Sequence, residues 1–168
     1  MAALTGDVKV IRDGTPGNAS QPVNQPVKAN QTIYRGSVAI TRSGYMYPAT
    51  APLSSDVVWG IVDKYGPGFA DTAPGIVGGA TDGAVTMEIA TGSFFLANVS
   101  TNASDIATQA SVGLPVYLVD ETHFSMWNDN GLRPLAGVLN RIEPFMSAQY
   151  GLFSVKLGAQ AGGTGAPQ

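Results

Sequence analysis

The sequence predicts an all-β protein, built as a small barrel or sandwich of short antiparallel strands. Val and Ile total 24 residues against 10 Leu, and branched side chains suit a pleated sheet better than a helix. Glu and Lys, which often fill exposed helix faces, total only 7. The 21 Gly and 11 Pro interrupt the 168-residue chain at short intervals, as expected for many short strands in one domain.

Ten segments are expected to form strands, because branched and alternating apolar residues occur in them between turn signals. In the expected strand 84–91, Val85, Met87 and Ile89 share one face and Thr86 lies on the other. The expected strands span residues 7–12, 36–42, 45–48, 57–64, 84–91, 93–98, 115–120, 122–127, 135–143 and 151–157.

One short helix of at most two turns is predicted at residues 104–113. Ser104 can cap its first turn, and Asp105 places an acid where the helix dipole favours one. Gly113 can end the helix in a left-handed conformation.

The sequence also indicates a possible internal duplication. Each half contains a hairpin, a strand that begins with Gly, and a closing strand. Gly60 and Gly137 lie 77 positions apart, and each begins the motif Gly-[Ile/Val]-[Val/Leu]-x-[Lys/Arg]. The alternative is that Gly- and Val-rich β sequences resemble one another through composition alone.

Three parts of the chain differ in composition. Residues 1–32 are expected to form an extended N-terminal arm, because residues 13–32 carry three prolines and little apolar mass. The alternative is that residues 7–12 form the first strand of the barrel and residues 13–32 a loop. Residues 33–157 are expected to form the β-rich domain. Residues 158–168 read as a flexible Gly/Ala-rich tail.

The charge balance excludes some partners. Nine basic against twelve acidic residues give a net charge of −3, which argues against nucleic-acid binding. No stretch approaches the ~20 apolar residues of a membrane-spanning helix, and no signal peptide is recognised, so we expect cytoplasmic synthesis and no membrane partner. Charged residues make up only 12%, so we expect other subunits to cover much of the surface. A monomer with a polar, uncharged surface is the alternative.

Candidate chemistry is sparse. The chain has no Cys and a single His, which excludes a disulfide, a thiolate zinc site and a multi-histidine metal site within one chain. Asp120, Glu121 and His123 fall on an expected turn with alternate side chains on opposite faces, and we interpret them as solvated turn residues. No catalytic, cofactor-binding or metal-binding residue is predicted.

The aromatic residues suggest core or contact positions. Trp59 lies in an apolar strand and is expected in the core. Trp127 precedes a turn, so it suits either the core or an interface. Tyr45 and Tyr47 share a strand face, which fits a core or a carbohydrate platform. Trp127, Tyr45 and Tyr47 are therefore the candidates for an oligomer interface.

Five motifs of strands and glycines follow one another along the chain. They are Tyr-x-Gly-x-Val-x-Ile at 34–40, Gly-Ile-Val at 60–62, Val-x-Met-x-Ile-Ala-x-Gly-x-Phe at 85–94, Gly-x-Pro-Val-Tyr-Leu-Val-Asp at 113–120 and Ala-Gly-Val-Leu at 136–139. In this order of elements, residues 30–157 resemble the capsid cement, or head decoration, proteins of tailed bacteriophages.

The resemblance implies a β-rich protein without enzymatic activity, often trimeric, bound to the major capsid protein on the outside of the head shell. Such a protein stabilises the shell by bridging capsomers. The extended arm is expected to pair with a sheet edge of the neighbouring protein. Its candidate capsid-binding residues are Val8, Val10, Ile11, Val23 and Val27. The alternatives are a receptor- or carbohydrate-binding β-module on a virion, and a tail-tube or head-completion protein.

Overall fold

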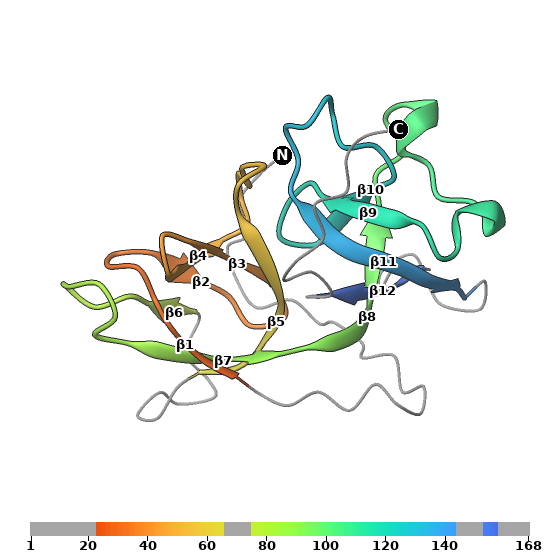
Figure 1. Cartoon of the computed structure of the whole chain (residues 1–168). Coiled ribbons are helices and arrows are strands. Elements are labelled where there is room, and N and C mark those ends of the chain that lie inside the picture. The colour runs from red at the N-terminus through yellow and green to blue at the C-terminus, as the bar shows by residue number, and fades with distance from the viewer. Residues whose placement is uncertain (1–22, 66–74, 144–152, 158–168) are drawn as a thin grey trace.

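The computed structural model describes residues 23–65, 75–143 and 153–157, and these are nearly all β-structure (Figure 1). The first half forms a five-stranded antiparallel sheet with the strand order β1-β7-β5-β3-β4. Its strands are β1 (Val23–Pro26), β3 (Val38–Arg42), β4 (Tyr45–Pro48), β5 (Val57–Tyr65) and β7 (Thr86–Ala90). A small ladder of β2 (Thr32–Ile33) and β6 (Ile76–Val77) accompanies this sheet.

The second half is a closed five-stranded barrel with the order β10-β8-β12-β11-β9. Its strands are β8 (Gly92–Asn98), β9 (Pro115–Leu118), β10 (His123–Ser125), β11 (Leu135–Ile142) and β12 (Phe153–Leu157). All neighbours are antiparallel except β8 and β10, which close the barrel as a parallel pair. The strands β7 and β8 run from the sheet into the barrel, and Thr91 alone separates them (Figure 1).

The sheet and the barrel repeat one topology. Without the short β2–β6 ladder, the five strands of the first unit are, in chain order, β1, β3, β4, β5 and β7, and those of the barrel are β8 to β12. In each unit the first strand pairs with the fifth, the fifth with the fourth, the fourth with the second, and the second with the third. The third strand then returns to the first in parallel orientation. In the barrel this contact is the β8–β10 pair, and in the first unit it is a single bridge between Val27 and Met46.

The register of the strands repeats as well. Ala39 lies opposite Gly60 in the first unit, and Val116 lies opposite Gly137 in the second. Each member of the second pair lies 77 positions after its counterpart (116 − 39 and 137 − 60). In both units the residue before the glycine is the extra residue of a β-bulge, and a second bulge follows in the same strand. The structure therefore contains the repeat that the sequence indicated.

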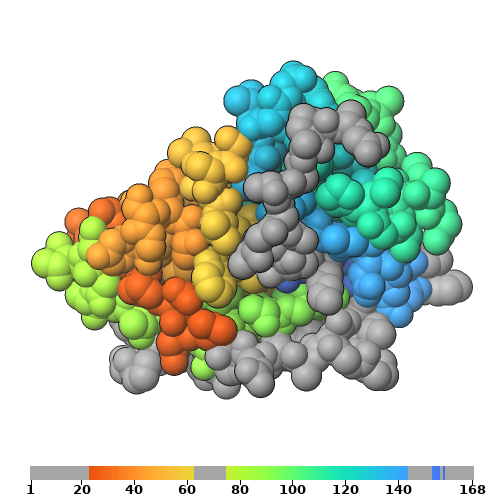
Figure 2. Space-filling model, in the orientation of Figure 1, coloured from red at the N-terminus to blue at the C-terminus, as the bar shows by residue number. Residues whose placement is uncertain are grey.

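The two units share a continuous core. Along β3, Ala39 belongs to a cluster inside the first unit, whereas Val38 and Ile40 belong to a second cluster that extends into the barrel interior around Phe124 and Leu139. The first sheet is therefore buried on both faces, and the space-filling view shows the two units in close contact (Figure 2). Because they share this buried core, the two units form one rigid body.

Most of the expected strands are present. The nine strands predicted from residue 36 onward correspond to β3, β4, β5 and β7 through β12. The sequence missed β1 and the two-residue strands β2 and β6. The strand predicted at 7–12 and the tail at 158–168 lie outside the described residues.

The boundary of the N-terminal arm at residue 32 was wrong. β1 pairs with β7, and Val27 is fully buried in the first core cluster. Residues 23–32 therefore belong to the β-rich domain, and Val27 is not available to bind a capsid. Pro26 is tolerated because β1 uses only one side for its ladder, so a missing N–H on the other side costs little.

The helix predicted at 104–113 was also wrong. Two 3₁₀ turns take its place, η1 (Ala103–Asp105) and η2 (Gln109–Ser111). Ser104 is not the cap. Asn102 and Asp105 form a capping box around η1 instead, and Asp105 turns inward. Within the described part of the chain, no helix has the length and apolar character needed to cross a bilayer.

Candidate functional site

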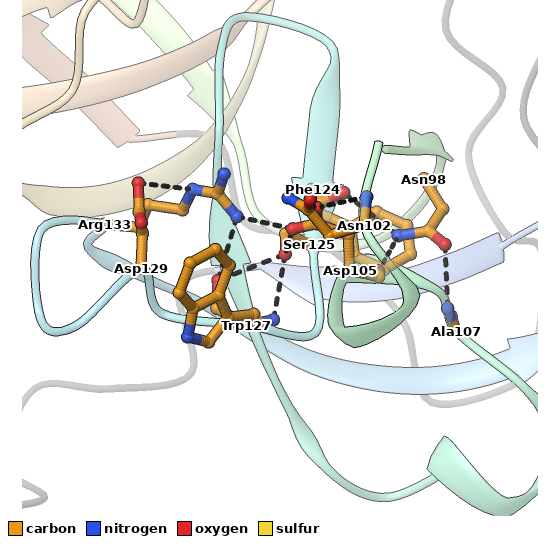
Figure 3. Close-up of polar contacts among 9 residues, drawn as sticks. All are labelled: Asn98, Asn102, Asp105, Ala107, Phe124, Ser125, Trp127, Asp129 and Arg133. Carbon is orange, nitrogen blue, oxygen red and sulfur yellow. Dashed lines mark hydrogen bonds and ion pairs between the residues drawn. The ribbon is translucent and has the colours of Figure 1, made fainter. Parts of the chain in front are cut away.

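Asp105 is fully buried, and its carboxylate accepts four hydrogen bonds (Figure 3). One oxygen accepts from Ser125 Oγ at 2.6 Å and from Arg133 Nη1 at 2.8 Å. The other accepts from the backbone N–H of Asn102 at 3.1 Å and from its side-chain amide at 3.0 Å. The carboxylate therefore joins residues that lie as far apart as positions 102 and 133.

Trp127 is held by the same network. Its backbone N–H donates to Ser125 Oγ at 2.9 Å, and its carbonyl accepts from Arg133 Nη1 at 3.0 Å. The guanidinium of Arg133 lies 5.6 Å from the centre of the Trp127 ring, a cation–π contact. Asp129 lies 3.9 Å from Arg133 Nε on the outer side (Figure 3).

Asn98, the last residue of β8, connects this network to the barrel. Its amide donates to the carbonyl of Asp105 at 2.8 Å and to that of Phe124 at 3.1 Å. Its side-chain oxygen accepts from the N–H of Ala107 at 2.8 Å. Every polar atom of this amide group therefore fixes the path of a loop.

The electrostatics of Asp105 keep it charged. Burial alone would raise its pKa, but the hydrogen bonds from Ser125, Arg133 and Asn102 outweigh that effect and lower the pKa to about 2. The carboxylate is therefore ionised at neutral pH and serves as a permanent acceptor.

A comparable pair occurs in the first unit. The side chain of Asp56 is fully buried, and Arg42 binds it through Nε and Nη2, each at 2.8 Å. Asp56 also accepts the N–H of Leu53 at 2.7 Å. The hydrogen bond to Asp56 raises the pKa of Arg42, so the guanidinium stays charged. Arg42 also lies 5.0 Å from the ring centre of Tyr47.

The two pairs occupy related places in the repeat. Asp56 and Arg133 are separated by 77 positions (133 − 56), which is the repeat spacing. Each lies in the loop between the third and fourth strands of its unit. In both units, therefore, a buried Asp–Arg pair with an aromatic ring beneath the guanidinium fixes this loop.

The turn at Asp120 to His123 differs from its sequence interpretation as solvated residues on opposite faces. Asp120 Oδ1 accepts the backbone N–H groups of Thr122 and His123, both at 2.9 Å, and approaches His123 Nδ1 at 2.9 Å. Glu121 is buried, and its carbonyl accepts the N–H of Val38 at 2.8 Å. The turn therefore joins the barrel to the first unit.

The ion pair in this turn shifts the pKa values of Asp120 and His123. The hydrogen bond that His123 Nδ1–H donates to Asp120 raises the pKa of His123. Burial opposes ionisation of Asp120, but the bond from His123 and those from the backbone lower its pKa overall. The Thr122 hydroxyl approaches the same ring nitrogen, Nδ1, at 2.9 Å. Because hydroxyl and carboxylate meet one nitrogen, the ring does not relay a proton between them as it does in a Ser-His-Asp triad.

The candidate interface aromatics are all half-buried and lie beside cations. Lys28 is 5.7 Å from the ring centre of Tyr45, and Arg42 and Arg133 lie over Tyr47 and Trp127. A cation therefore lies over one face of each ring. Trp59 packs against the first core cluster, as expected.

The candidate capsid-binding residues divide into two groups. Val23 lies half-buried in β1, and Val27 is buried. Val8, Val10 and Ile11 lie outside the described residues. Within residues 23–65, 75–143 and 153–157, no group of three or more His, Cys, Asp or Glu side chains could hold a metal ion.

Sequence reasoning missed the Asp105 network altogether. Its members are spread over more than thirty positions, and the one available signal was a lone acid in an otherwise uncharged segment, 99–114. No protein-family model matches this chain, and neither a curated protein nor a solved structure matches it.

Proposed function

We propose that this protein is a structural virion protein that binds the outside of a tailed-phage head shell. It stabilises the shell by bridging subunits of the major capsid protein, and it is not an enzyme. The observation that carries this proposal is that the buried charged pairs hold surface loops in place. Two Asp–Arg pairs fix surface loops in place, one in each repeat, and so give a rigid body with preformed contact loops.

The acid–base groups support a binding role. A general acid or base works best when its pKa lies near the operating pH. The pKa of Asp105 is about 2, so it stays ionised, and all its described contacts hold loops. Asp120 and His123 are paired with each other in a turn that joins the two units.

The order of strands and glycines supports the phage assignment through its resemblance to cement proteins. The composition supports association, because only 12% of the residues are charged. A homo-oligomer, most simply a trimer, with Tyr45, Tyr47 and Trp127 near its interface remains part of the proposal. The attachment arm is now confined to residues 1–22, which contain Val8, Val10 and Ile11.

The test is binding to shells assembled from the major capsid protein of the same genome. The purified chain should sediment with these shells to a fixed stoichiometry. It should also raise the temperature at which they come apart. A chain that neither sediments with the shells nor changes their dissociation temperature would refute the proposal. Deletion of residues 1–22 tests the arm separately, and unchanged binding would exclude it.

A further inference from the structure

The turn between β9 and β10 bonds to two separate parts of the fold. The carbonyl of Glu121 accepts the N–H of Val38 at 2.8 Å, which joins the barrel to the first unit. The carbonyl of Thr122 accepts the N–H of Ala97 at 3.2 Å, which belongs to the parallel β8–β10 contact that closes the barrel. That contact pairs only two residues of each strand, so each of its bonds matters more than a bond in a longer ladder.

A carboxylate holds this turn, whereas the backbone alone holds its counterpart in the first unit. The counterpart, residues 43–44, lies 77 positions earlier (120 − 43) and has positive φ at both residues. None of residues 120–122 adopts a positive φ. Instead, Asp120 Oδ1 accepts the backbone N–H groups of Thr122 and His123, both at 2.9 Å. The second turn therefore depends on a charged side chain.

His123 is the group that faces this carboxylate. Its Nδ1 lies 2.9 Å from Asp120 Oδ1 and 3.1 Å from Oδ2. A protonated ring donates a charge-assisted hydrogen bond there. A neutral ring donates a weaker bond, or its bare Nδ1 accepts the Thr122 hydroxyl at 2.9 Å and repels the carboxylate. His123 also pairs with Ala97 in the β8–β10 contact, so the titrating ring lies where the barrel closes.

The groups around His123 leave it as the one that titrates near neutral pH. It is the only His, and the chain has no Cys. The adjacent strand β8 contains no ionisable residue, and β9 contributes Tyr117, whose phenol ordinarily titrates near pH 10. In the turn Glu121 is buried, and Asp120 is the charged group that raises the pKa of His123. The segment of the first unit that meets the turn contains Arg35, which stays charged throughout.

From this arrangement we infer that the proton on His123 keeps the turn closed, and that its loss loosens the β8–β10 contact together with the bond to the first unit. The inference does not depend on the proposed function. Because the pKa of His123 is raised, the closed turn is favoured below pH 6.5, and this preference is lost as the pH rises through the raised pKa. The opening is local, because the shared core does not titrate in this range.

The size of the effect follows from the exposure of the pair. The side chain of His123 is 38% exposed and that of Asp120 13%. Water screens a pair of this kind, so its loss should make opening about 2- to 5-fold more frequent. The turn is thus a graded, pH-sensitive closure and not an all-or-none switch.

The experiment is amide hydrogen exchange of the full chain, followed by NMR between about pH 5 and about pH 9. Protection factors are corrected for the intrinsic effect of pH on exchange. The amides of Ala97 and Val38 should both lose protection about 2- to 5-fold as His123 loses its proton. The amide of Val27, which bonds to the carbonyl of Val85 at 2.9 Å within the first unit, is the reference and should not change.

Two variants separate the charge from the turn. His123→Gln removes the titrating group, so the protection of both amides should be independent of pH and equal to the wild-type value at high pH. Asp120→Asn keeps an oxygen for the backbone N–H groups but removes the charge, so it should also abolish the pH dependence. The matched control is Asp82→Asn, which breaks the ion pair with Lys28 elsewhere on the surface and should keep the wild-type pH dependence.

The other outcomes overturn the inference. Protection at Ala97 and Val38 that stays constant across the pH range would refute it, and so would a change that persists in His123→Gln. A loss at Ala97 alone would refute the link between barrel closure and the first unit. In the wild type the amide changes must share their midpoint with the ring resonances of His123, so a different midpoint refutes the inference even if a variant does not fold.

Discussion

Replacing Asp105 by Asn should destabilise the protein by about 2.5 kcal/mol or more at pH 7. The carboxylate has a pKa of about 2 in place of 3.8. That difference is nearly two units, and each unit corresponds to about 1.4 kcal/mol of preference for the ionised form in the folded state. Asn keeps the size of Asp but removes the charge that Arg133 requires, and its NH₂ group faces donors.

The assay is urea unfolding of both chains between pH 2 and pH 7, followed by circular dichroism. Because the folded-state pKa is depressed, the stabilisation is fully present above pH 3.8 and is lost as the pH falls toward about 2. The difference between the two chains should therefore shrink over that window.

Asp129→Asn is the matched control. Its carboxylate is partly exposed and 3.9 Å from Arg133, so the loss should stay below about 1 kcal/mol. A loss at Asp105 no larger than that at Asp129, or one that does not vary with pH, would refute the reasoning.

Three further predictions concern other parts of the molecule. The His123 ring, followed by NMR, should titrate above pH 6.5. Its ion pair with Asp120 should stabilise the protein below pH 6.5, and this stabilisation should be lost as the pH rises through the raised pKa of His123. A ring that titrates at or below pH 6.5 would contradict the geometry. Gly60→Ala should cost about 2 kcal/mol in urea unfolding, because its Cβ would lie 2.1 Å from the carbonyl oxygen of Ala90. Deletion of residues 1–31 should leave the chain unfolded or insoluble, since it removes β1 and part of the first core; a folded, soluble product would show that β1 is dispensable.

Gly44→Ala is the control for Gly60. Nothing lies within 4 Å of its Cβ position, so only the strain of its positive φ remains, about 1 kcal/mol. An equal cost at both positions would show that the close approach at Gly60 relaxes freely.

The strands could be predicted where the signal is local. β4 (Tyr45–Pro48) was predicted to the residue because a Ser-Gly turn precedes it, and Ser43 and Gly44 both adopt positive φ there. The motif at Gly60 and Gly137 correctly indicated the repeat, because the bulge before each glycine depends on its immediate neighbours.

The remaining features depend on distant residues. β1 carries only one branched residue and is defined by its partner β7, so its own sequence reads as an irregular arm. Segment 104–113 has the caps of a helix, but Asp105 gains more from Ser125 and Arg133 than one helical turn offers. To predict two 3₁₀ turns in place of a helix, one would have to know that Ser125 and Arg133 lie within hydrogen-bonding distance of Asp105.

The most direct test of the proposed structural role is an electron cryomicroscopy reconstruction of phage particles produced from the genome that encodes this chain. The proposal predicts density for the two β-units on the outer surface of the head, in repeated copies that contact the capsid subunits. A head without that density, or density for this chain only in the tail or the connector, would contradict it.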